Sequence, residues 1–458
     1  MKSFVGFFQS LVLSLLKGWI VLALRVYFRK AKVEGLENIP RNKPILFAPN
    51  HQYAFMDALI VTRFSGKIPY FLVRADFFES PVSGFLLRAL RMMPVYRTRE
   101  KVDMMEKNEE IFDKCVEILE NRDRLIIFPE GNHSKIRRIR IIKKGIFRIA
   151  FKAINEEPDS KDLVIIPVGI NYDDQSKFQS DYYLRFGKPI TVNDYNEGYQ
   201  ENQARSMETL KDLISKQLAD LTIHIDNAES YKFYENMLKV YSRPYCIEKN
   251  YKFRKLDIRF KAYREIIEGL DSIKEMNPIE FKDIQPKFNR FHNLLRKNKI
   301  NPMALEKVKE NPWQRTYKAI ILISLWPFYF YGLINNLLGA IIPAFLSIKA
   351  VSDDHFLSSV QLGIGLLSFP ISYFLQSWIV FKLTGSPFYT FLYVISIILF
   401  GLFSQKYRYQ YKKTFEILKF RRLLIKRKKD YRTILKTYRE VIDFMNNQLI
   451  REKVPETV

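Results

Sequence analysis

Cysteine is scarce in this chain, which has only Cys115 and Cys246 in 458 residues. Two cysteines so far apart in the sequence do not make a disulfide framework or a four-ligand zinc site. We therefore expect both thiols to be reduced and buried, as in a protein on the cytoplasmic face of a membrane. The chain is long enough for about two or three domains and for a complete enzyme core.

Acidic residues are also fewer than basic residues. The chain has 49 Asp and Glu against 74 Lys and Arg, so its formal net charge is +25. Such an excess indicates an anionic partner, which could be a nucleic acid, a phosphate-bearing small molecule or an anionic membrane surface. Aromatic residues reach 15%, and most of them are Tyr and Phe. This content suits both a membrane interface and single-stranded nucleic acid, so composition alone does not choose between them.

Sequence signatures of covalent and metal catalysis are missing too. The chain has no Gly-x-Ser-x-Gly motif, no cysteine beside a histidine motif, no zinc-ligand spacing, no phosphate loop and no dinucleotide fingerprint. We therefore expect no metal and no cofactor. A reaction in which a histidine activates a substrate hydroxyl for direct attack requires none of these features.

Residues 31–225 show the pattern of an α/β domain. Short apolar runs that end in turn residues predict buried strands, and helical stretches separate them. The expected strands are 43–50, 67–76, 124–131, 163–172 and 182–190, and the expected helices are 55–65, 81–91, 102–121 and 144–155. This alternation predicts a mostly parallel sheet that is covered by helices on both faces. Functional residues should then lie in the loops after the carboxyl ends of the strands.

The segments on either side of this domain carry no catalytic motif. Residues 1–30 resemble a signal peptide but lack a small-x-small cleavage site, and Lys17 interrupts the apolar run. A lysine in mid-span costs about 2.5–3.5 kcal/mol, so we expect a membrane-anchoring helix that lies in or dips into one leaflet. Residues 226–312 are polar and helical in period, and we interpret them as a helical connector. His224 and His292 are interpreted as structural or surface residues.

Three long apolar runs, 319–348, 356–381 and 388–403, predict membrane helices within residues 313–407. The first run is longer than one span requires. Basic residues flank the runs, and cytoplasmic flanks carry the excess of Lys and Arg. All these flanks lie on one side if the first run bends near Asn335 and Asn336. We therefore expect two hairpins with both ends in the cytoplasm.

The tail, residues 408–458, is basic and amphipathic. It suits a cytoplasmic helix that lies against anionic lipid headgroups, although a solvated helix fits nearly as well. Nucleic acid is the third alternative. Because the charge lies beside membrane runs, we expect membrane lipids, and no nucleic acid, as the partner.

A histidine and an aspartate lie close together after the first expected strand. His51 follows the apolar run and a proline, and Asp57 comes six residues later. On a straight helix six steps of 100° would set the two side chains about 120° apart. They can meet only if His51 lies in the loop and Asp57 lies in the first turns of the next helix. A carboxylate placed there can orient the imidazole of a general base.

Three further segments carry residues that suit a phosphate ester. Glu130 and Gly131 end another strand, and Gly131 lets the backbone approach a ligand closely. Arg97 follows an apolar segment and can clamp a phosphate through two parallel hydrogen bonds. Lys143 and Lys144 precede the helix expected near residue 145. A helix N-terminus among basic residues is a site for anions.

These residues fall into an order that resembles a known family. The blocks are Asn50-His51 with Asp57, Arg97, Phe128-Pro129-Glu130-Gly131, and Ile166-Pro167-Val168. Together they resemble the four sequence blocks of the glycerophospholipid acyltransferase family over about residues 35–225. Any single block is weak evidence, whereas the set of four is specific.

The resemblance implies a reaction and a role for each matched residue. The implied reaction is acyl transfer from acyl-CoA or acyl carrier protein to a hydroxyl of a glycerol phosphate. It further implies that His51 is the base and Asp57 orients it. Arg97 and the Glu130–Gly131 loop would bind the glycerol phosphate, and Pro167 would belong to the acyl-donor side. We expect backbone amides of the 130–132 turn to stabilise the oxyanion.

Two departures from the family pattern bear on the acceptor. The common spacing is His-x4-Asp, one residue shorter, and the third block commonly continues with Thr-Arg where this chain has Asn132 and His133. The phosphate contact of that block would then fall to another basic residue, namely Arg137, Arg138, Lys143 or Lys144. Both departures resemble the branch that acylates glycerol-3-phosphate or dihydroxyacetone phosphate and carries carboxyl-terminal membrane segments. Glycerol-3-phosphate is therefore the favoured acceptor.

Two alternatives remain open from the sequence. One is an enzyme that acylates lysophosphatidate or another lysolipid. The other is a membrane-tethered binding protein with an inactive acyltransferase domain, although the intact His51, Asp57, Arg97 and Glu130 argue against it. The expected location is the cell membrane, with several passes and the catalytic domain on the cytoplasmic face.

Overall fold

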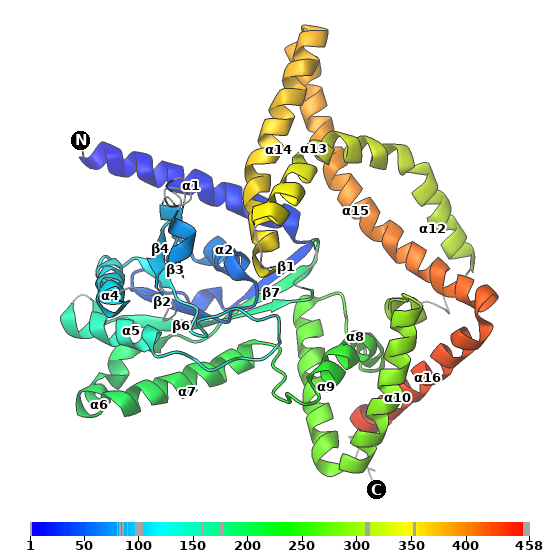
Figure 1. Cartoon of the computed structure of the whole chain (residues 1–458), viewed down its shortest axis with the longest axis horizontal. Helices are drawn as coiled ribbons and strands as arrows, with labels where there is room; N and C mark the ends of the chain where they lie inside the picture. The colour runs from blue at the N-terminus through cyan, green and yellow to red at the C-terminus, as the bar shows by residue number, and fades with distance from the viewer. Residues whose placement is uncertain are drawn as a thin grey trace. The chain divides into compact units, whose positions relative to one another are not determined.

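The computed structural model describes residues 2–79, 81, 84, 87–88, 90–96, 104–157, 160–174, 178–306, 312–350 and 354–451 (Figure 1). The chain forms two compact units. The first comprises the residues up to His224 together with Leu346–Leu366, and the second comprises Ile225–Phe345 and Leu367–Val458. The candidate site lies in the first unit.

An eight-stranded sheet forms the centre of the first unit (Figure 1). The strands are β1 (Lys30–Glu34), β2 (Ile45–Pro49), β3 (Tyr70–Arg74), β4 (Met92–Val95), β5 (Arg124–Ile126), β6 (Val164–Tyr172), β7 (Asp181–Phe186) and β8 (Ile190–Thr191). Their order is β1-β7-β6-β2-β5-β3-β4, and β8 pairs with β6. The strands from β6 to β4 run parallel, whereas β7 is antiparallel to β6. The predicted mostly parallel sheet is confirmed. Strands β1, β4 and β8 escaped prediction because they are short and only partly buried.

Helices cover both faces of this sheet, as expected. They are α1 (Lys2–Tyr27), α2 (Ala54–Phe64), α4 (Met104–Glu120), α5 (Gly145–Glu156), α6 (Asn196–Glu201) and α7 (Gln203–Leu221). Successive residues of a strand point to opposite faces. Phe47 of β2 therefore joins α1 and α2 in one apolar cluster, and Leu46 joins α4, α5 and α7 in another. Of the helix expected at 81–91, residues 82, 83, 85, 86 and 89 lie outside the described residues, and the described residues 81, 84, 87 and 88 are helical.

The strand order brings three loops to one edge of the sheet. Strand β2 lies between β5 and β6 and is parallel to both, with Phe47 opposite Ile126 and Pro49 opposite Val168. The carboxyl ends of the three strands therefore meet. The loop that follows β2, the loop that follows β5 and the last residues of β6 are neighbours in space, although more than 100 residues separate the first from the last.

Helix α1 packs on the sheet through one side only. Ile20 and Leu24 are buried in the apolar cluster that contains α2, whereas Leu15 and Leu22 are exposed. The Lys17 ammonium donates a hydrogen bond to the carbonyl of Gly66, so its charge is held at a loop of the domain. An exposed apolar stripe of this kind is what an interfacial helix presents. Anchoring by α1 stays a prediction.

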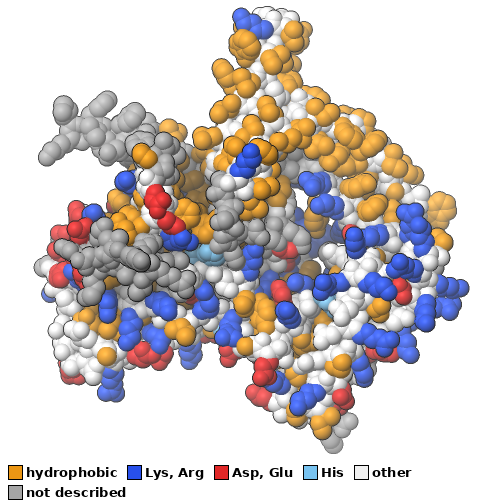
Figure 2. Space-filling model, in the orientation of Figure 1, with side chains coloured by type: hydrophobic (Ala, Val, Ile, Leu, Met, Phe, Trp, Pro, Cys, Tyr) orange, Lys and Arg blue, Asp and Glu red, His pale blue; other side chains and the backbone are white. Residues whose placement is uncertain are grey.

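The described part of the second unit is helical. Its helices are α8 (Tyr231–Glu248), α9 (Leu256–Met276), α10 (Pro278–Lys297), α11 (Met303–Glu306), α12 (Pro312–Ser324), α13 (Trp326–Ala350), α14 (Asp354–Thr384), α15 (Pro387–Lys426) and α16 (Lys428–Asn446). The last residues of α13 and the first turns of α14 belong to the first unit. Within the described residues, three stretches are long and apolar enough to cross a membrane: Trp326–Lys349, Phe356–Thr384 and Pro387–Leu423. Apolar side chains dominate the visible surface of these helices (Figure 2).

The predicted bend near Asn335 and Asn336 is wrong, whereas the membrane topology stays a prediction. Helix α13 runs through both residues without a break. Each side-chain amide donates to the carbonyl four residues earlier at 2.8 Å. Asn335 also accepts from the Tyr393 hydroxyl at 2.7 Å, and Asn336 donates to the carbonyl of Ile397 at 3.0 Å. Because a neighbouring helix satisfies these polar groups, the helix can continue through them.

The basic tail is not a separate helix that begins at residue 408. Helix α15 continues to Lys426. Helix α16 then buries Ile434, Val441 and Met445 and packs against α10. The apolar face of α16 is therefore occupied within the second unit and does not offer a free amphipathic face to lipid.

Gly169 in β6 tests how closely α7 packs on the sheet. A Cβ at this position would lie 2.3 Å from the carbonyl oxygen of Leu221, the last residue of α7. We expect Gly169→Ala to destabilise the purified full-length protein by about 1–3 kcal/mol, because the backbone must move. A thermal melt in detergent measures this. Gly145→Ala is the matched control, since its added Cβ meets no described atom within 4 Å beyond its chain neighbours and the backbone of its own helix. An unchanged melting temperature for Gly169→Ala would contradict the packing.

Candidate active site

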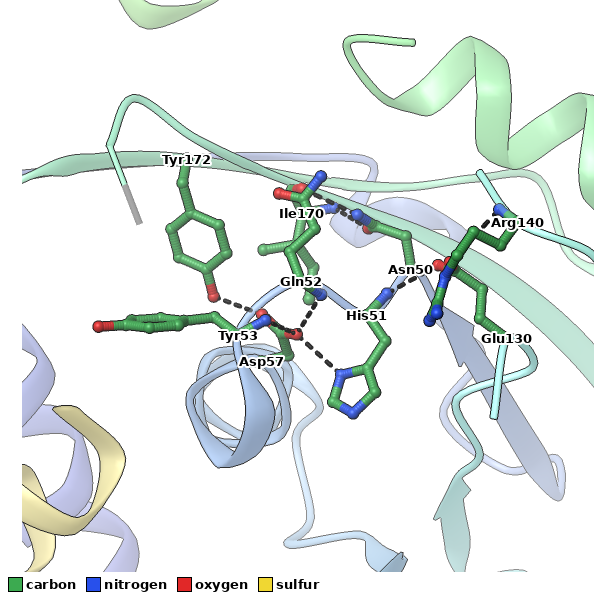
Figure 3. A network of polar contacts seen from close by, with 9 residues as sticks. All are labelled: Asn50, His51, Gln52, Tyr53, Asp57, Glu130, Arg140, Ile170 and Tyr172. Carbon is green, nitrogen blue, oxygen red and sulfur yellow. Dashed lines mark hydrogen bonds and ion pairs between the residues drawn. The ribbon is translucent and has the colours of Figure 1, made fainter. Parts of the chain in front are cut away.

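Asn50 fixes the loop that carries His51. Its side chain is 1% exposed and pairs with Ile170 of β6 in both directions (Figure 3). The Asn50 amide donates to the Ile170 carbonyl at 3.2 Å, and its oxygen accepts from the Ile170 amide at 2.7 Å. An asparagine can do this because it offers a donor and an acceptor side by side. The first residue after β2 is thereby attached to the end of β6.

His51 and Asp57 form the pair that the sequence predicted. The His51 Nδ1 and the Asp57 Oδ2 are 2.9 Å apart. His51 lies in the loop, and Asp57 lies in the first turn of α2, which begins at Ala54. Ala54 has a φ of 42°, a left-handed conformation that provides the bend between the two residues. The second ring nitrogen of His51, Nε2, points away from the network (Figure 3). It is therefore free to meet a substrate.

The carboxylate of Asp57 is fully buried and fully hydrogen-bonded. Its side chain is 0% exposed, whereas that of His51 is 14% exposed. Besides the imidazole, Asp57 Oδ2 accepts from the amides of Gln52 at 2.8 Å and Tyr53 at 2.7 Å. Asp57 Oδ1 accepts from the hydroxyl of Tyr172 at 2.6 Å. Burial raises the pKa of Tyr172 well above its ordinary value, so this hydroxyl keeps its proton and remains a donor.

Glu130 holds the backbone of His51. One carboxylate oxygen accepts from the His51 amide at 2.9 Å. The other accepts from Arg140, at 3.0 Å from its Nε and 3.3 Å from its backbone amide. Burial raises the pKa of the Glu130 carboxyl, and the hydrogen bonds from His51 and Arg140 offset part of that rise. Glu130 thus positions the loop and the guanidinium together.

Arg140 is a site residue that sequence reasoning missed. It lies in the basic stretch after residue 134, but nothing in that stretch distinguishes it from its neighbours. Its Nη2 is buried and has no hydrogen-bond partner among the described residues. A buried cationic donor that has no partner among the described residues and lies near His51 is suited to an anionic ligand. Arg137, by contrast, donates to the carbonyls of Tyr172 and Asp173 at 3.0 Å and supports the end of β6.

The third sequence block surrounds the imidazole. Phe128 stacks on the ring of His51 with centroids 3.9 Å apart, and His133 meets it edge-on at 5.6 Å. Gly131 has a φ of 69°, which favours glycine because a side chain there is strained. Its amide donates to the Phe128 carbonyl at 3.1 Å, so the Gly131 amide of the predicted oxyanion turn is already engaged.

The remaining predicted residues lie at different distances from this network. The Lys143 side chain runs along Gly131, and its Cγ lies 3.3 Å from the position that a Cβ on Gly131 would occupy. The Lys143 amide donates to the Pro129 carbonyl at 2.7 Å. Lys144 is the exposed residue that precedes α5. Pro167 lies within β6 opposite Ala48, before the residues that face the site. Arg97 lies outside the described residues.

Both cysteines are free and buried, as predicted. Burial raises the pKa of Cys115 to about 12 and that of Cys246 to about 11. Cys115 belongs to the apolar cluster on the face of the sheet covered by α4, α5 and α7, whereas Cys246 lies in α8 of the second unit. Neither thiol can act as a nucleophile beside His51.

Known proteins are similar to part of this chain. The sequence model of the family described as Acyltransferase matches residues 30–171. The chloroplastic 1-acyl-sn-glycerol-3-phosphate acyltransferase LPAT1 of Arabidopsis thaliana is 32% identical over 140 residues, which are 30% of this chain and 36% of that protein. Glycerol-3-phosphate O-acyltransferase 2 of Saccharomyces cerevisiae is 29% identical over 137 residues, which are 30% of this chain and 17% of that protein.

A solved structure is also similar. The crystal structure of the 1-acyl-sn-glycerophosphate acyltransferase PlsC from Thermotoga maritima matches with 21% identity and a TM-score of 0.35, over 46% of this chain and 80% of that chain. The chain spans little more than a third of the plant protein and less than a fifth of the yeast protein. Each of these two curated proteins matches 30% of this chain.

Proposed function

We propose, from the match of residues 30–171 to the family model described as Acyltransferase, that the protein is a membrane-bound enzyme of phospholipid synthesis. It moves a fatty acyl group from acyl-CoA or acyl carrier protein to a hydroxyl of glycerol-3-phosphate. The observation that carries the proposal is the pairing of His51 with the buried Asp57 at 2.9 Å. A histidine held in this way is a general base whose Nε2 faces the substrate.

The reaction follows from the two ends of the imidazole. The Nε2 of His51 takes the proton of the acceptor hydroxyl while the oxygen attacks the thioester carbonyl. Asp57 accepts from Nδ1, which fixes the tautomer and stabilises the imidazolium that forms. The tetrahedral intermediate then collapses, the carbon–sulfur bond breaks, and the imidazolium returns its proton to the leaving thiolate. General-base action of this kind contributes about 10²–10⁴-fold to a rate.

The basic residues beside Glu130 support a phosphate-bearing acceptor. Arg140 offers the unpartnered Nη2, and Lys143 lies against the Gly131 turn. In our proposal these two cations bind the phosphate that the family's third-block arginine would bind, since His133 stands at that position here. The relatives whose names state an activity act on glycerol-3-phosphate or on 1-acyl-sn-glycerol-3-phosphate. Lysophosphatidate is therefore the alternative acceptor, and Arg97 and Lys144 stay predicted contacts.

Three helices of suitable length and composition support a membrane location. We propose a multi-pass protein of the cell membrane whose sheet domain faces the cytoplasm, where acyl thioesters are made. The two free, buried cysteines are consistent with that side. Membrane lipids then surround the second unit and receive the acylated product.

The proposed base is tested with purified full-length protein, radiolabelled glycerol-3-phosphate and palmitoyl-CoA. We expect His51→Ala to lower turnover by at least about 100-fold, because the general base is lost. His292→Ala is the matched control, since His292 stacks on Phe288 in the second unit. Wild-type turnover by His51→Ala would reject the mechanism. Lysophosphatidic acid is tested as the acceptor in a parallel assay. A kcat/KM higher than that for glycerol-3-phosphate would identify lysophosphatidate as the preferred acceptor.

The hydroxyl of Tyr172 gives a second test, because it touches Asp57 and no reacting atom. Tyr172→Phe removes one hydrogen bond to the buried charge. We expect kcat to fall about tenfold or more while KM for the acceptor stays the same, since a hydrogen bond to a charged group is worth about 1.5–3 kcal/mol. Tyr182→Phe serves as control, because Tyr182 is also buried and accepts at 2.9 Å from Arg63. An equal fall in kcat in both variants would count against a specific role for Tyr172.

A further inference from the structure

The first turns of α14 belong to the catalytic unit, although they lie nearly 200 residues beyond the matched acyltransferase region. Leu362 is part of the apolar cluster that contains α1 and α2. The carbonyl of Leu366 accepts from the indole nitrogen of Trp19 at 3.1 Å. Ser358 is buried, and its side chain interacts with the hydroxyl of Tyr53, the residue that precedes α2. These separate contacts fix the start of α14 on the site.

Phe356 extends from this segment to the neighbours of the base. It is 7% exposed, and its ring lies 5.1 Å from that of His133. His133 in turn meets His51 edge-on at 5.6 Å. Phe356 also contacts Phe55 of α2 at 5.7 Å and Phe77 at 5.2 Å. Figure 1 shows the start of α14 beside α2, in agreement with these contacts.

The surroundings of His51 are therefore polar on one side and aromatic on another. Glu130 and Arg140 supply ionic groups at the backbone of the base. The rings of Phe55, Phe77 and Phe356 supply apolar surface beyond His133. Of the two substrates, the phosphate ester needs cations and the fatty acyl chain needs apolar surface. The aromatic side is the one that suits the acyl chain.

We propose that Phe356 is a specificity-determining residue that, with Phe55 and Phe77, forms the wall against which the acyl chain of the donor lies next to the thioester. A membrane helix outside the acyltransferase domain thus completes the donor site. This inference rests on the proposed function. It implies that the side-chain volume at position 356 determines which lengths or shapes of donor acyl chain the enzyme accepts, without changing the binding of the acceptor.

The chain-length profile of the full-length enzyme tests this wall. kcat/KM is measured for acyl-CoA donors from lauroyl to stearoyl with Phe356→Ala and Phe356→Leu. We expect the ratio between two donors to change by at least about tenfold, since a few methylenes in an apolar pocket discriminate by that much. KM for the acceptor should stay the same. Phe374→Ala is the matched control, because Phe374 lies on the same helix and is 70% exposed. An unchanged donor ratio in both active Phe356 variants would overturn the proposal.

Thiol labelling gives a readout that does not depend on turnover. Both native cysteines are 0% exposed, so Phe356→Cys introduces the reactive thiol without further changes. We expect palmitoyl-CoA to slow its labelling by a maleimide at least about threefold, because a bound chain covers the wall. Coenzyme A alone should not protect it, and the thiol of Phe374→Cys should not be protected by either compound.

The two experiments separate this proposal from the proposed function. Protection at position 356 in a protein that transfers no acyl group would uphold the donor wall and reject the enzyme. Normal acyl transfer with no protection by palmitoyl-CoA would uphold the enzyme and reject the wall. A melting temperature for each variant in detergent establishes that the protein measured is folded.

Discussion

The buried carboxylate of Asp57 is the interaction on which the rest of the catalytic edge depends. A charge without contact with water costs several kcal/mol unless donors surround it. Here the donors are the ring of His51, the amides of Gln52 and Tyr53, and the hydroxyl of Tyr172. The hydrogen bonds to Asp57 fix the position of each of these donors. The carboxylate sets the ring orientation of His51, the shape of the loop before α2 and the packing of the end of β6 against that loop.

The strand order makes this arrangement possible. Because β5, β2 and β6 are adjacent and parallel, the loop with His51 has Glu130 on one side and Ile170 on the other. Glu130 accepts from the His51 amide and Asn50 pairs with Ile170, so His51 is held by its backbone as well as by its ring. The sheet provides rigid support, and the left-handed Ala54 absorbs the extra residue between base and carboxylate. Strain of this kind persists only where the surroundings fix it.

Local sequence patterns predicted the central strands and the pairing of His51 with Asp57. Contacts between residues far apart in the sequence were not predicted. Apolar runs predicted the central strands, and the six-residue spacing placed His51 in a loop. Tyr172 and Asp57 are 115 residues apart, and no pattern in a β-strand distinguishes a tyrosine that bonds a carboxylate from one that fills a core. For the same reason the sequence did not distinguish Arg140 from the basic residues around it. The predicted bend in α13 failed because its asparagines find partners on another helix, which an isolated segment does not reveal.

The most direct test of this account is the turnover of Asp57→Asn beside that of the wild type. The amide cannot accept from all the donors that surround it, so the imidazole loses its fixed tautomer and its counter-charge. By analogy with a catalytic triad, we predict a fall in kcat of about 10⁴-fold. Asp181→Asn provides the comparison, since Asp181 is also buried but pairs with Arg29. A kcat of Asp57→Asn within about tenfold of the wild type would contradict the claim that this buried charge makes His51 a base.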